Sequence, residues 1–288
     1  MTLKDLEAHF AGALSSSYGR EEAHAIFLMA IDHLLGYKRT DYILKKTELL
    51  TDRQWLQLKS LLTELQSGKP IQYVLGETVF YGLPFKVNPS VLIPRPETEE
   101  LVEWVLESTA LDAAISTRLR LIDIGTGSGC IAVSLKKNLP AAEVFALDVS
   151  QAALDTAKAN ALLNGVDVTF ISADIRQFGS GQKFDVVISN PPYVTLQEKE
   201  QMLDHVLDHE PHLALFVSNE DPLIFYEAIA DFSWNTLRDM GLLFFEINEY
   251  LAKETIELLK AKSFTNIELK KDMQGKDRMI KCSKGTAV

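Results

Sequence analysis

The stretch that decides the fold is Asp123-Ile124-Gly125-Thr126-Gly127-Ser128-Gly129-Cys130. It follows the apolar run 119–122 and precedes an apolar, helix-like segment over residues 131–138. Glycines at alternate positions permit positive φ and let a ligand approach the backbone closely. The spacing differs from the G-x-G-x-x-G of dinucleotide-binding proteins. Residues 125–129, which we call the glycine loop, therefore predict a strand-to-helix turn that either binds a ligand or is only a tight turn.

Acidic residues end the next two predicted strands. Residues 143–148 predict a strand ending at Asp148, roughly 20 residues after the loop, where related folds place a carboxylate that binds ribose hydroxyls. Residues 168–171 predict a third strand, with Asp174 just beyond it. Open α/β sheets bind ligands at the carboxyl ends of their strands, so we expect these carboxylates to meet the glycine loop at one edge.

A fourth predicted strand, residues 184–189, delivers Asn190-Pro191-Pro192-Tyr193 to the same edge. Two prolines fix their own φ and restrict the residues before them, so this turn is stiff. It offers acceptor oxygens, an Asn amide and an aromatic face, which suits a substrate with a planar NH2 group. The alternative is an ordinary strand-ending bend with a packed tyrosine. The position behind a buried strand, downstream of the glycine loop, favours the binding role.

The rest of the chain completes two domains and a connector. Residues 1–69 predict a small helical bundle from amphipathic stripes, which serves either packing or substrate docking. Residues 70–90 predict a connector, with a short hairpin over residues 73–87 because aromatic and β-branched residues surround glycines there. Residues 91–288 predict the ligand-binding α/β domain.

The C-terminal part continues the alternation of strands and helices. Residues 241–247 predict a fifth strand and residues 250–260 a helix. Residues 267–269 and 278–282 predict a closing antiparallel pair. The predicted fold class is α/β, a Rossmann-like, mostly parallel seven-stranded sheet with helices on both faces.

Composition and charge narrow the class of protein. The 288 residues are 47% hydrophobic, enough for a sizeable core. No apolar run reaches the ~18 residues of a membrane helix, and the N-terminus lacks a signal-peptide core, so we expect a cytoplasmic protein that does not enter membranes. The two cysteines lack metal-ligand spacing, and a disulfide between them is not expected there.

The acidic charge is unevenly distributed. Residues 1–69 contain 9 basic and 9 acidic residues, while the other 20 basic and 31 acidic residues produce the whole net charge of −11. An acidic α/β domain disfavours a long nucleic-acid backbone as its partner. Arg95 is an exception, a cation held between Pro94 and Pro96 just before a predicted helix, with either a solvated or an orienting role.

These motifs resemble the release factor glutamine methyltransferases, the PrmC/HemK family of S-adenosylmethionine-dependent enzymes. The glycine loop is common to many methyltransferases, and the Asn-Pro-Pro-Tyr turn also occurs in enzymes that methylate nucleobase amino groups. The run Leu92-Ile93-Pro94-Arg95-Pro96-Glu97-Thr98-Glu99 is much more specific than these two motifs and indicates glutamine methylation. The resemblance covers nearly the whole chain and also includes Gly68-Lys69-Pro70, Phe80-Tyr81-Gly82, His209-Glu210-Pro211 and the tail from Asp272 to Arg278.

The resemblance implies methyl transfer from S-adenosyl-L-methionine to the side-chain amide nitrogen (N5) of the glutamine in the Gly-Gly-Gln loop of peptide chain release factors. Residues Asn190, Pro191, Pro192 and Tyr193 would hold the substrate amide at the reacting centre, and Arg95 would help to bind the substrate. The glycine loop would bind the methionine end of the cofactor, Asp148 the ribose, and Asp174 with Ile175 the adenine. Asn190 would touch both cofactor and substrate.

Three positions depart from the family pattern. Asn248 stands where the family usually has glycine, and because Asn tolerates positive φ we expect the turn to be kept. Ile175 and Arg176 stand where an aromatic or apolar pair is common, which gives less stacking on adenine. Asp221-Pro222 replaces a more usual Asp-Gly.

Three other functions compete with this one. A nucleic-acid amino methyltransferase would use the same turn, but it would need a basic groove. A glutamine methyltransferase acting on a ribosomal protein differs only in its substrate. A non-enzymatic adaptor is disfavoured because the turn and Asp148 are intact.

Overall fold

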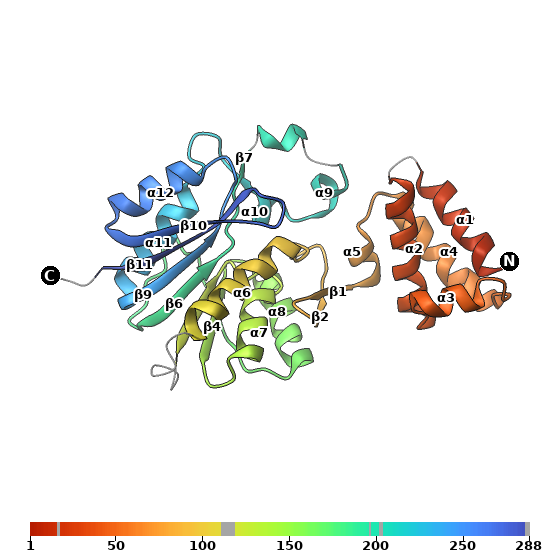
Figure 1. Cartoon of the computed structure of the whole chain (residues 1–288), viewed down its shortest axis with the longest axis horizontal. Helices are drawn as coiled ribbons and strands as arrows, with labels where there is room; N and C mark the ends of the chain where they lie inside the picture. Colours follow the sequence, from red (N-terminus) through yellow and green to blue (C-terminus); the bar gives the residue numbers. More distant parts are fainter. Residues whose placement is uncertain (16–17, 111–118, 196, 202–203, 286–288) are drawn as a thin grey trace. The chain divides into compact units, whose positions relative to one another are not determined.

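The structure is a computed structural model that describes residues 1–15, 18–110, 119–195, 197–201 and 204–285 (Figure 1). The chain divides into two compact units. The first contains Met1–Gly76 and helix α9 (Asp204–His209), and the second contains the remainder of the described chain. No helix in the described ranges has the length and apolar character needed to cross a bilayer.

The first unit is a helical bundle. Its helices bury one apolar face each around Phe10, Phe27, Leu58 and Leu62. Thr51 begins one of them with a capping box, since its side chain accepts from the Gln54 N–H. Besides α9, the helices are α1 (Leu3–Leu14), α2 (Arg20–Leu35), α3 (Arg39–Lys45), α4 (Asp52–Gln66) and α5 (Ile71–Leu75).

The hairpin predicted over residues 73–87 is shorter than expected. It consists of β1 (Glu77–Phe80) and β2 (Leu83–Lys86) in antiparallel pairing. The residues before it form helix α5, which ends at Gly76 with φ 75°. Strand propensity at Tyr73 and Val74 is overridden because the bundle buries one side of this helical turn, including Ile71.

A seven-stranded sheet forms the centre of the second unit, in the order β10-β11-β9-β6-β3-β4-β5. Strands β9, β6, β3, β4 and β5 are parallel, whereas β11 is antiparallel to both β9 and β10. The strands are β3 (Arg120–Ile124), β4 (Glu143–Asp148), β5 (Thr169–Ser172), β6 (Phe184–Ser189), β9 (Leu237–Glu246), β10 (Phe264–Lys271) and β11 (Asp277–Lys284).

Helices cover both faces of this sheet. Successive residues of a strand point to opposite faces, so Leu121 packs in one apolar cluster and Ile122 in the other. The first cluster includes side chains of α6 (Pro96–Ala110), α7 (Cys130–Asn138) and α8 (Gln151–Asn164). The second includes those of α11 (Ile224–Thr236) and α12 (Ala252–Ala261). The predicted α/β fold with a mostly parallel seven-stranded sheet is confirmed.

Short elements complete the second unit. Strands β7 (Val194–Thr195) and β8 (Phe216–Val217) pair in parallel just beyond the Asn-Pro-Pro-Tyr turn. The 3-10 helix η1 (Glu198–Gln201) and helix α10 (His212–Leu215) lie in the segment between these two strands. The predicted fifth strand begins earlier than expected, at Leu237 rather than Gly241.

Candidate active site

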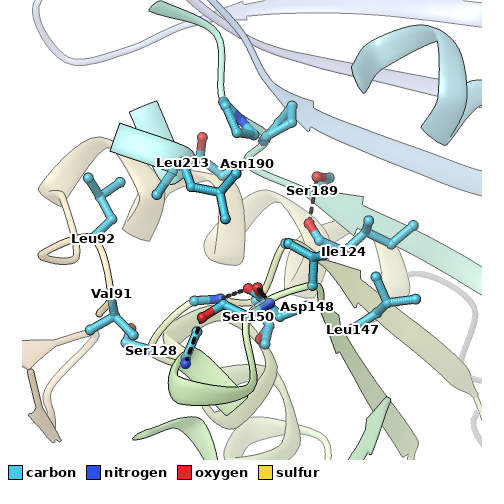
Figure 2. A pocket seen from close by; sticks show the side chains of 18 of the residues that line it. Val91, Leu92, Ile124, Ser128, Leu147, Asp148, Ser150, Ser189, Asn190 and Leu213 are labelled. Atoms are coloured by element: carbon cyan, nitrogen blue, oxygen red, sulfur yellow. Dashed lines mark hydrogen bonds between the residues drawn. The ribbon is translucent and has the colours of Figure 1, made fainter. Parts of the chain in front are cut away.

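A cavity of about 380 Å³ opens at the carboxyl ends of the parallel strands (Figure 2). Most of the residues predicted from the sequence line it together, although they come from four strand ends and from the segment before α6. These lining residues are Arg95, Gly125, Thr126, Gly127, Ser128, Asp148, Asp174, Ile175, Asn190, Pro191 and Pro192.

Two of the predicted residues lie elsewhere. Gly129 packs against α8, and a Cβ added there would lie 3.0 Å from the Ala157 Cβ at a φ of 80°, so any other residue would be strained. Tyr193 lines a smaller cavity of about 160 Å³. The two cavities share Arg95, Asn190 and Pro191 as lining residues, so the turn borders both.

The glycine loop is held by the backbone of the neighbouring strand. The N–H groups of Gly125 and Thr126 both donate to the Leu147 carbonyl of β4, at 2.8 and 3.0 Å. Gly125, Gly127 and Gly129 have φ of 74°, 53° and 80°, a region that disfavours other residues. The alternating glycines therefore fix a loop whose path follows the end of β4.

Asp148, at the end of β4, also binds the backbone of the glycine loop. Its Oδ2 accepts from the Gly127 N–H at 2.9 Å and its Oδ1 from the Ser150 N–H at 2.8 Å (Figure 2). Burial raises the pKa of this carboxyl above its ordinary value, and the backbone N–H groups oppose that shift. A carboxylate has about four acceptor positions, so hydrogen bonds to two ligand hydroxyls remain possible.

The loop leaves a cradle that suits S-adenosylmethionine. A Cβ added at Gly125 or Gly127 would meet no protein atom within 4 Å, so the backbone of both residues is uncovered. A ligand can therefore lie directly against the peptide groups of the loop, with the Asp148 carboxylate beside it. The N–H groups of Gly125, Thr126 and Gly127 are bonded within the protein, so the group left for a ligand is the Asp148 carboxylate, which fits the hydroxyls of a ribose.

The predicted adenine end of the cavity contains an ion pair. Arg176 binds both oxygens of Asp174, with Nη2–Oδ2 at 2.6 Å and Nε–Oδ1 at 3.0 Å, and this pairing lowers the pKa of the Asp174 carboxyl. Ile175 is buried in the apolar cluster that includes side chains of α11, and it also lines the cavity. Arg176 is thus a direct neighbour of the predicted adenine site.

Side chains from distant elements hold the Asn-Pro-Pro-Tyr turn. The Asn190 Nδ2 donates to the Thr98 Oγ1 of α6 at 3.2 Å, and Thr98 donates to the Glu246 Oε2 at 2.7 Å. The Tyr193 hydroxyl donates to the other Glu246 oxygen at 3.1 Å. Because the Asn190 NH2 faces Thr98, its carbonyl oxygen is directed away from Thr98.

Arg95 is engaged by a buried partner. Its Nη2 lies 2.6 Å from the Glu210 Oε1, and the Glu210 side chain is only 1% exposed. The other Glu210 oxygen accepts from the Ile93 N–H at 3.3 Å. Glu210 therefore holds the segment that contains Arg95, and the Arg95 side chain remains one-third exposed at both cavities.

Sequence reasoning did not assign a role to four residues around the turn. Thr98 and Arg278 lie in stretches that carry the family resemblance, Glu246 ends the fifth strand, and Asn248 was treated as a backbone substitution. Asn248 does not have positive φ; in the described ranges, the non-glycine residues that do are Tyr81, Met240, Ser263 and Asn266. Instead its Nδ2 donates to the Tyr193 carbonyl at 3.0 Å.

Comparisons with known proteins agree with this geometry. The Methyltransferase small domain family matches residues 106–214, and the PrmC N-terminal domain family matches residues 5–76. A solved methyltransferase structure from Pyrococcus furiosus is 17% identical with a TM-score of 0.52, covers 72% of this chain and 92% of its own, and shares the fold. The fold and the cavity thus define a methyltransferase that uses S-adenosylmethionine.

Two curated relatives define the family more narrowly. The release factor glutamine methyltransferase of Flavobacterium psychrophilum is 49% identical over 98% of this chain and 99% of its own length. The protein of the same name from Bacteroides thetaiotaomicron is 41% identical over 96% of this chain and 98% of its own. The chain belongs to the release factor glutamine methyltransferase family.

Proposed function

We propose that this protein transfers the methyl group of S-adenosylmethionine to the side-chain amide nitrogen of the glutamine in the Gly-Gly-Gln loop of peptide chain release factors. The observation that carries this proposal is the orientation of Asn190 at the border of two cavities. Its NH2 is bound to Thr98, so its carbonyl oxygen is available as an acceptor. Family membership and the names of the relatives support release factors as the substrate class.

The smaller cavity would receive the glutamine side chain. An amide nitrogen is a poor nucleophile because its lone pair is delocalised into its own carbonyl group. Acceptance of its two N–H groups by the Asn190 Oδ1 and the Pro191 carbonyl would fix the amide plane and increase electron density at nitrogen. Tyr193, which lines this cavity, would pack on that plane. Such positioning can supply several kcal/mol, up to about 7–11 in ideal intramolecular cases.

The larger cavity would hold the methyl donor, whose sulfonium makes the methyl carbon electrophilic. The glycine loop would bind its methionine end, Asp148 the ribose, and Asp174 with Ile175 the adenine. The amide nitrogen would bond to the methyl carbon as the carbon–sulfur bond breaks, and the electron pair of that bond would go to sulfur. One amide proton would then leave to solvent, which would restore a neutral amide and would require no dedicated base.

The helical unit would dock the release factor. The large apolar side chains exposed on it include Ile43, Leu44, Leu49 and Leu56, with exposed fractions of 58%, 80%, 76% and 63%. The unit carries no net charge through residue 69, unlike the acidic remainder. An apolar, neutral surface suits a protein partner better than a nucleic-acid backbone.

Labelled S-adenosylmethionine tests the proposal. The protein would be incubated separately with a purified release factor, with the same factor carrying alanine in place of the Gly-Gly-Gln glutamine, with a ribosomal protein fraction, and with DNA and RNA. We expect label only on the unsubstituted release factor. Transfer to nucleic acid or to a ribosomal protein, with none to the release factor, would overturn the substrate assignment.

A further inference from the structure

A buried carboxylate supports the Asn-Pro-Pro-Tyr turn from behind. Glu246 ends β9, is 1% exposed, and lies at the wall of the smaller cavity. Its Oε2 accepts from Thr98 and its Oε1 from Tyr193. An ionised carboxylate only accepts, so both hydroxyls must donate to it, and their hydrogen directions are thereby fixed.

The direction of the Thr98 hydroxyl decides the direction of the Asn190 amide. Because the Thr98 hydrogen points to Glu246, its oxygen can only accept from Asn190. An Asn190 amide rotated by half a turn would bring its carbonyl oxygen to a hydroxyl oxygen that has no hydrogen to offer. Glu246 thus selects the one amide orientation in which the Asn190 oxygen faces away from Thr98.

The other oxygen of Glu246 fixes the far end of the turn. The Tyr193 hydroxyl donates to it at 3.1 Å, and the Tyr193 carbonyl accepts from Asn248 at 3.0 Å. The Asn248 Oδ1 in turn accepts from the Tyr250 N–H at 2.9 Å, so the Asn248 amide is itself oriented. The last residue of the turn is therefore bonded directly to β9 and the residues that follow it, and the first is linked to β9 through Thr98.

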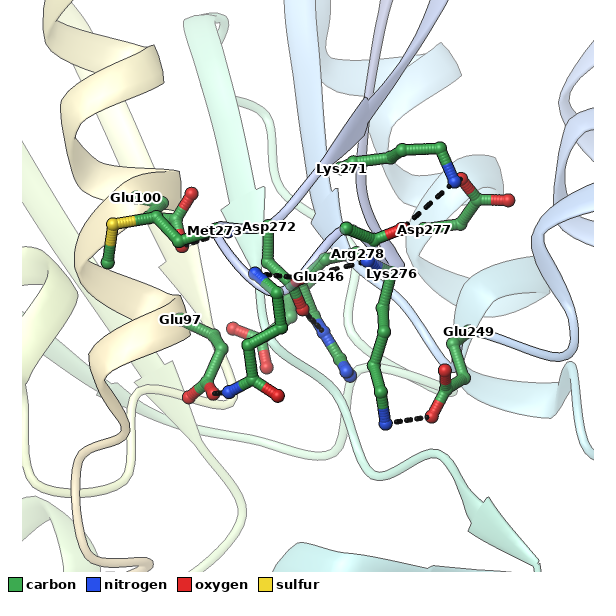
Figure 3. A network of polar contacts seen from close by, with 12 residues as sticks. Glu97, Glu100, Glu246, Glu249, Lys271, Asp272, Met273, Lys276, Asp277 and Arg278 are labelled. Carbon is green, nitrogen blue, oxygen red and sulfur yellow. Dashed lines mark hydrogen bonds and ion pairs between the residues drawn. The ribbon is translucent and has the colours of Figure 1, made fainter.

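The C-terminal hairpin consists of β10, β11 and the residues between them, and its Arg278 places a positive charge near this carboxylate (Figure 3). Burial raises the pKa of Glu246, and the positive charge of Arg278 on β11 opposes that shift. Arg278 is held by Asp272, with Nε–Oδ2 at 3.0 Å, and Asp272 accepts from the backbone N–H groups of Gln274 and Lys276.

The same hairpin is attached to the helix that carries Thr98. The Met273 N–H donates to Glu100 at 3.1 Å and the Gln274 side chain donates to Glu97 at 3.0 Å, both on α6 (Figure 3). The tail from Asp272 to Arg278, which the sequence resemblance includes, therefore joins β11 to α6 beside Glu246.

We propose that Glu246 is a positioning residue for methyl transfer, which acts through Thr98 on Asn190 and directly on Tyr193. This inference rests on the proposed function, since it assigns how the substrate amide is held. It gives Glu246, Thr98 and the C-terminal hairpin a shared role in holding the turn, and Thr98 also lines the larger cavity.

Matched substitutions at Thr98 test the inference most cleanly. Thr98→Ser keeps the hydroxyl, whereas Thr98→Val keeps the shape and removes it. We expect Thr98→Ser to retain near wild-type kcat and Thr98→Val to lower kcat about tenfold or more, because the acceptor that orients Asn190 and one donor to the Glu246 carboxylate are both lost. Glu246→Gln, which presents an NH2 to one of the two donors, should lower kcat by at least the same factor. Affinity for S-adenosylmethionine, measured by calorimetry, should be unchanged in Glu246→Gln and should change much less than kcat in the two Thr98 variants, because Thr98 also lines the larger cavity.

The outcomes separate this inference from the proposed function. Absence of methyl transfer by the wild-type protein would overturn the proposed function. A wild-type protein that methylates the release factor, with Thr98→Val equal to it in kcat, would overturn the inference alone. So would equal losses in Thr98→Ser and Thr98→Val, because the hydroxyl would then not be the determinant. If Glu246→Gln fails to fold, the Thr98 pair still decides.

Discussion

The glycine loop and the Asn-Pro-Pro-Tyr turn lie at the same edge of the sheet but are held by different means. The loop bonds through its backbone to residues 147 and 148 of the adjacent strand. The turn bonds through side chains to Thr98, 92 residues before Asn190, and to Glu246, 53 residues after Tyr193. The cofactor half of the site is thus built locally, and the substrate half by contacts distant in sequence.

This difference predicts how each half responds to substitution. Backbone bonds persist when a nearby side chain changes, so cofactor binding should depend on few side chains, Asp148 above all. Side-chain bonds are lost one at a time, so turnover should be sensitive to residues that act on the turn through another side chain, as Glu246 acts on Asn190 through Thr98. Affinity and turnover should therefore separate between variants of the two regions.

The largest expected effect is on turnover in Asn190→Ala. The variant loses one oriented acceptor, which by analogy with other transition-state hydrogen bonds lowers kcat by about 10²-fold or more. The apparent KM should rise much less, because the contact is made mainly in the reactive geometry. Steady-state kinetics with a release factor measures both constants.

Asn190→Asp sharpens the same comparison. It keeps an acceptor but adds a negative charge that attracts the sulfonium before reaction, so cofactor should bind while turnover is poor. Near wild-type methylation by Asn190→Ala or Asn190→Asp would show that the turn is an ordinary strand-ending bend without a role in the reaction.

The second largest expected effect is weaker cofactor binding in Asp148→Ala. A lost charged hydrogen bond is worth about 1.5–3 kcal/mol, which corresponds to roughly 10- to 150-fold weaker binding. Calorimetry measures it, and Asp155→Ala, an exposed carboxylate on the neighbouring helix α8, is the control. Unchanged affinity in a folded Asp148→Ala protein would show that the ribose is bound elsewhere.

A smaller effect is expected in the pH dependence of turnover. Charged and titratable groups facing Glu246 are Glu97 on α6, Tyr193 after β6, Tyr226 on α11 and Arg278 on β11. Burial raises the pKa of Glu246, so this carboxylate becomes protonated at a higher pH than an ordinary glutamate. As pH falls through that raised pKa, one Glu246 oxygen gains a hydrogen and no longer accepts from the hydroxyl that faces it, Thr98 or Tyr193, so kcat should fall.

Profiles of kcat at saturating cofactor and substrate measure this dependence. The acid limb should disappear in Glu246→Gln. The kcat of this variant is already low, and the variant has no carboxyl group to titrate at this position. An identical acid limb in the wild type and in this variant would assign the limb to another group.

The smallest effect is expected in Arg176→Ala. The ion pair with Asp174 is half-exposed on the arginine side, and such pairs contribute at most about 1 kcal/mol. Its removal frees the Asp174 Oδ2 for the adenine, while Oδ1 still accepts from the backbone N–H of residue 176, so cofactor affinity should increase by no more than about fivefold. Asp174→Ala should change affinity in the opposite direction. Weaker binding in Arg176→Ala would mean that the arginine itself contacts the cofactor.

The loop was predictable from the sequence because its structure is local. Alternate glycines, a preceding apolar run and an acidic residue one strand later all act within a short stretch of chain. The turn itself was also predictable, since two prolines restrict it directly. Helix α5 was not, because burial against the bundle overrode the strand propensity of Tyr73 and Val74.

The supports of the turn were not predictable from spacing. Thr98 and Glu246 are 148 residues apart, and Arg95 and Glu210 are 115 apart. Only the fold brings these pairs together. The sequence therefore placed Thr98 in a motif but did not indicate that Glu246 is its partner. Asn248 was expected to replace glycine by adopting positive φ, yet its side chain donates a hydrogen bond to the Tyr193 carbonyl.

The measurement that tests the central claim most directly is the position of the transferred methyl group. A release factor treated with the protein and S-adenosylmethionine would be digested and sequenced by tandem mass spectrometry, and the modified peptide hydrolysed in acid. We predict one added methyl group on the glutamine of Gly-Gly-Gln, and release of methylamine on hydrolysis, which places the methyl on the amide nitrogen. A methyl group on any other residue, or hydrolysis without methylamine, would contradict the account.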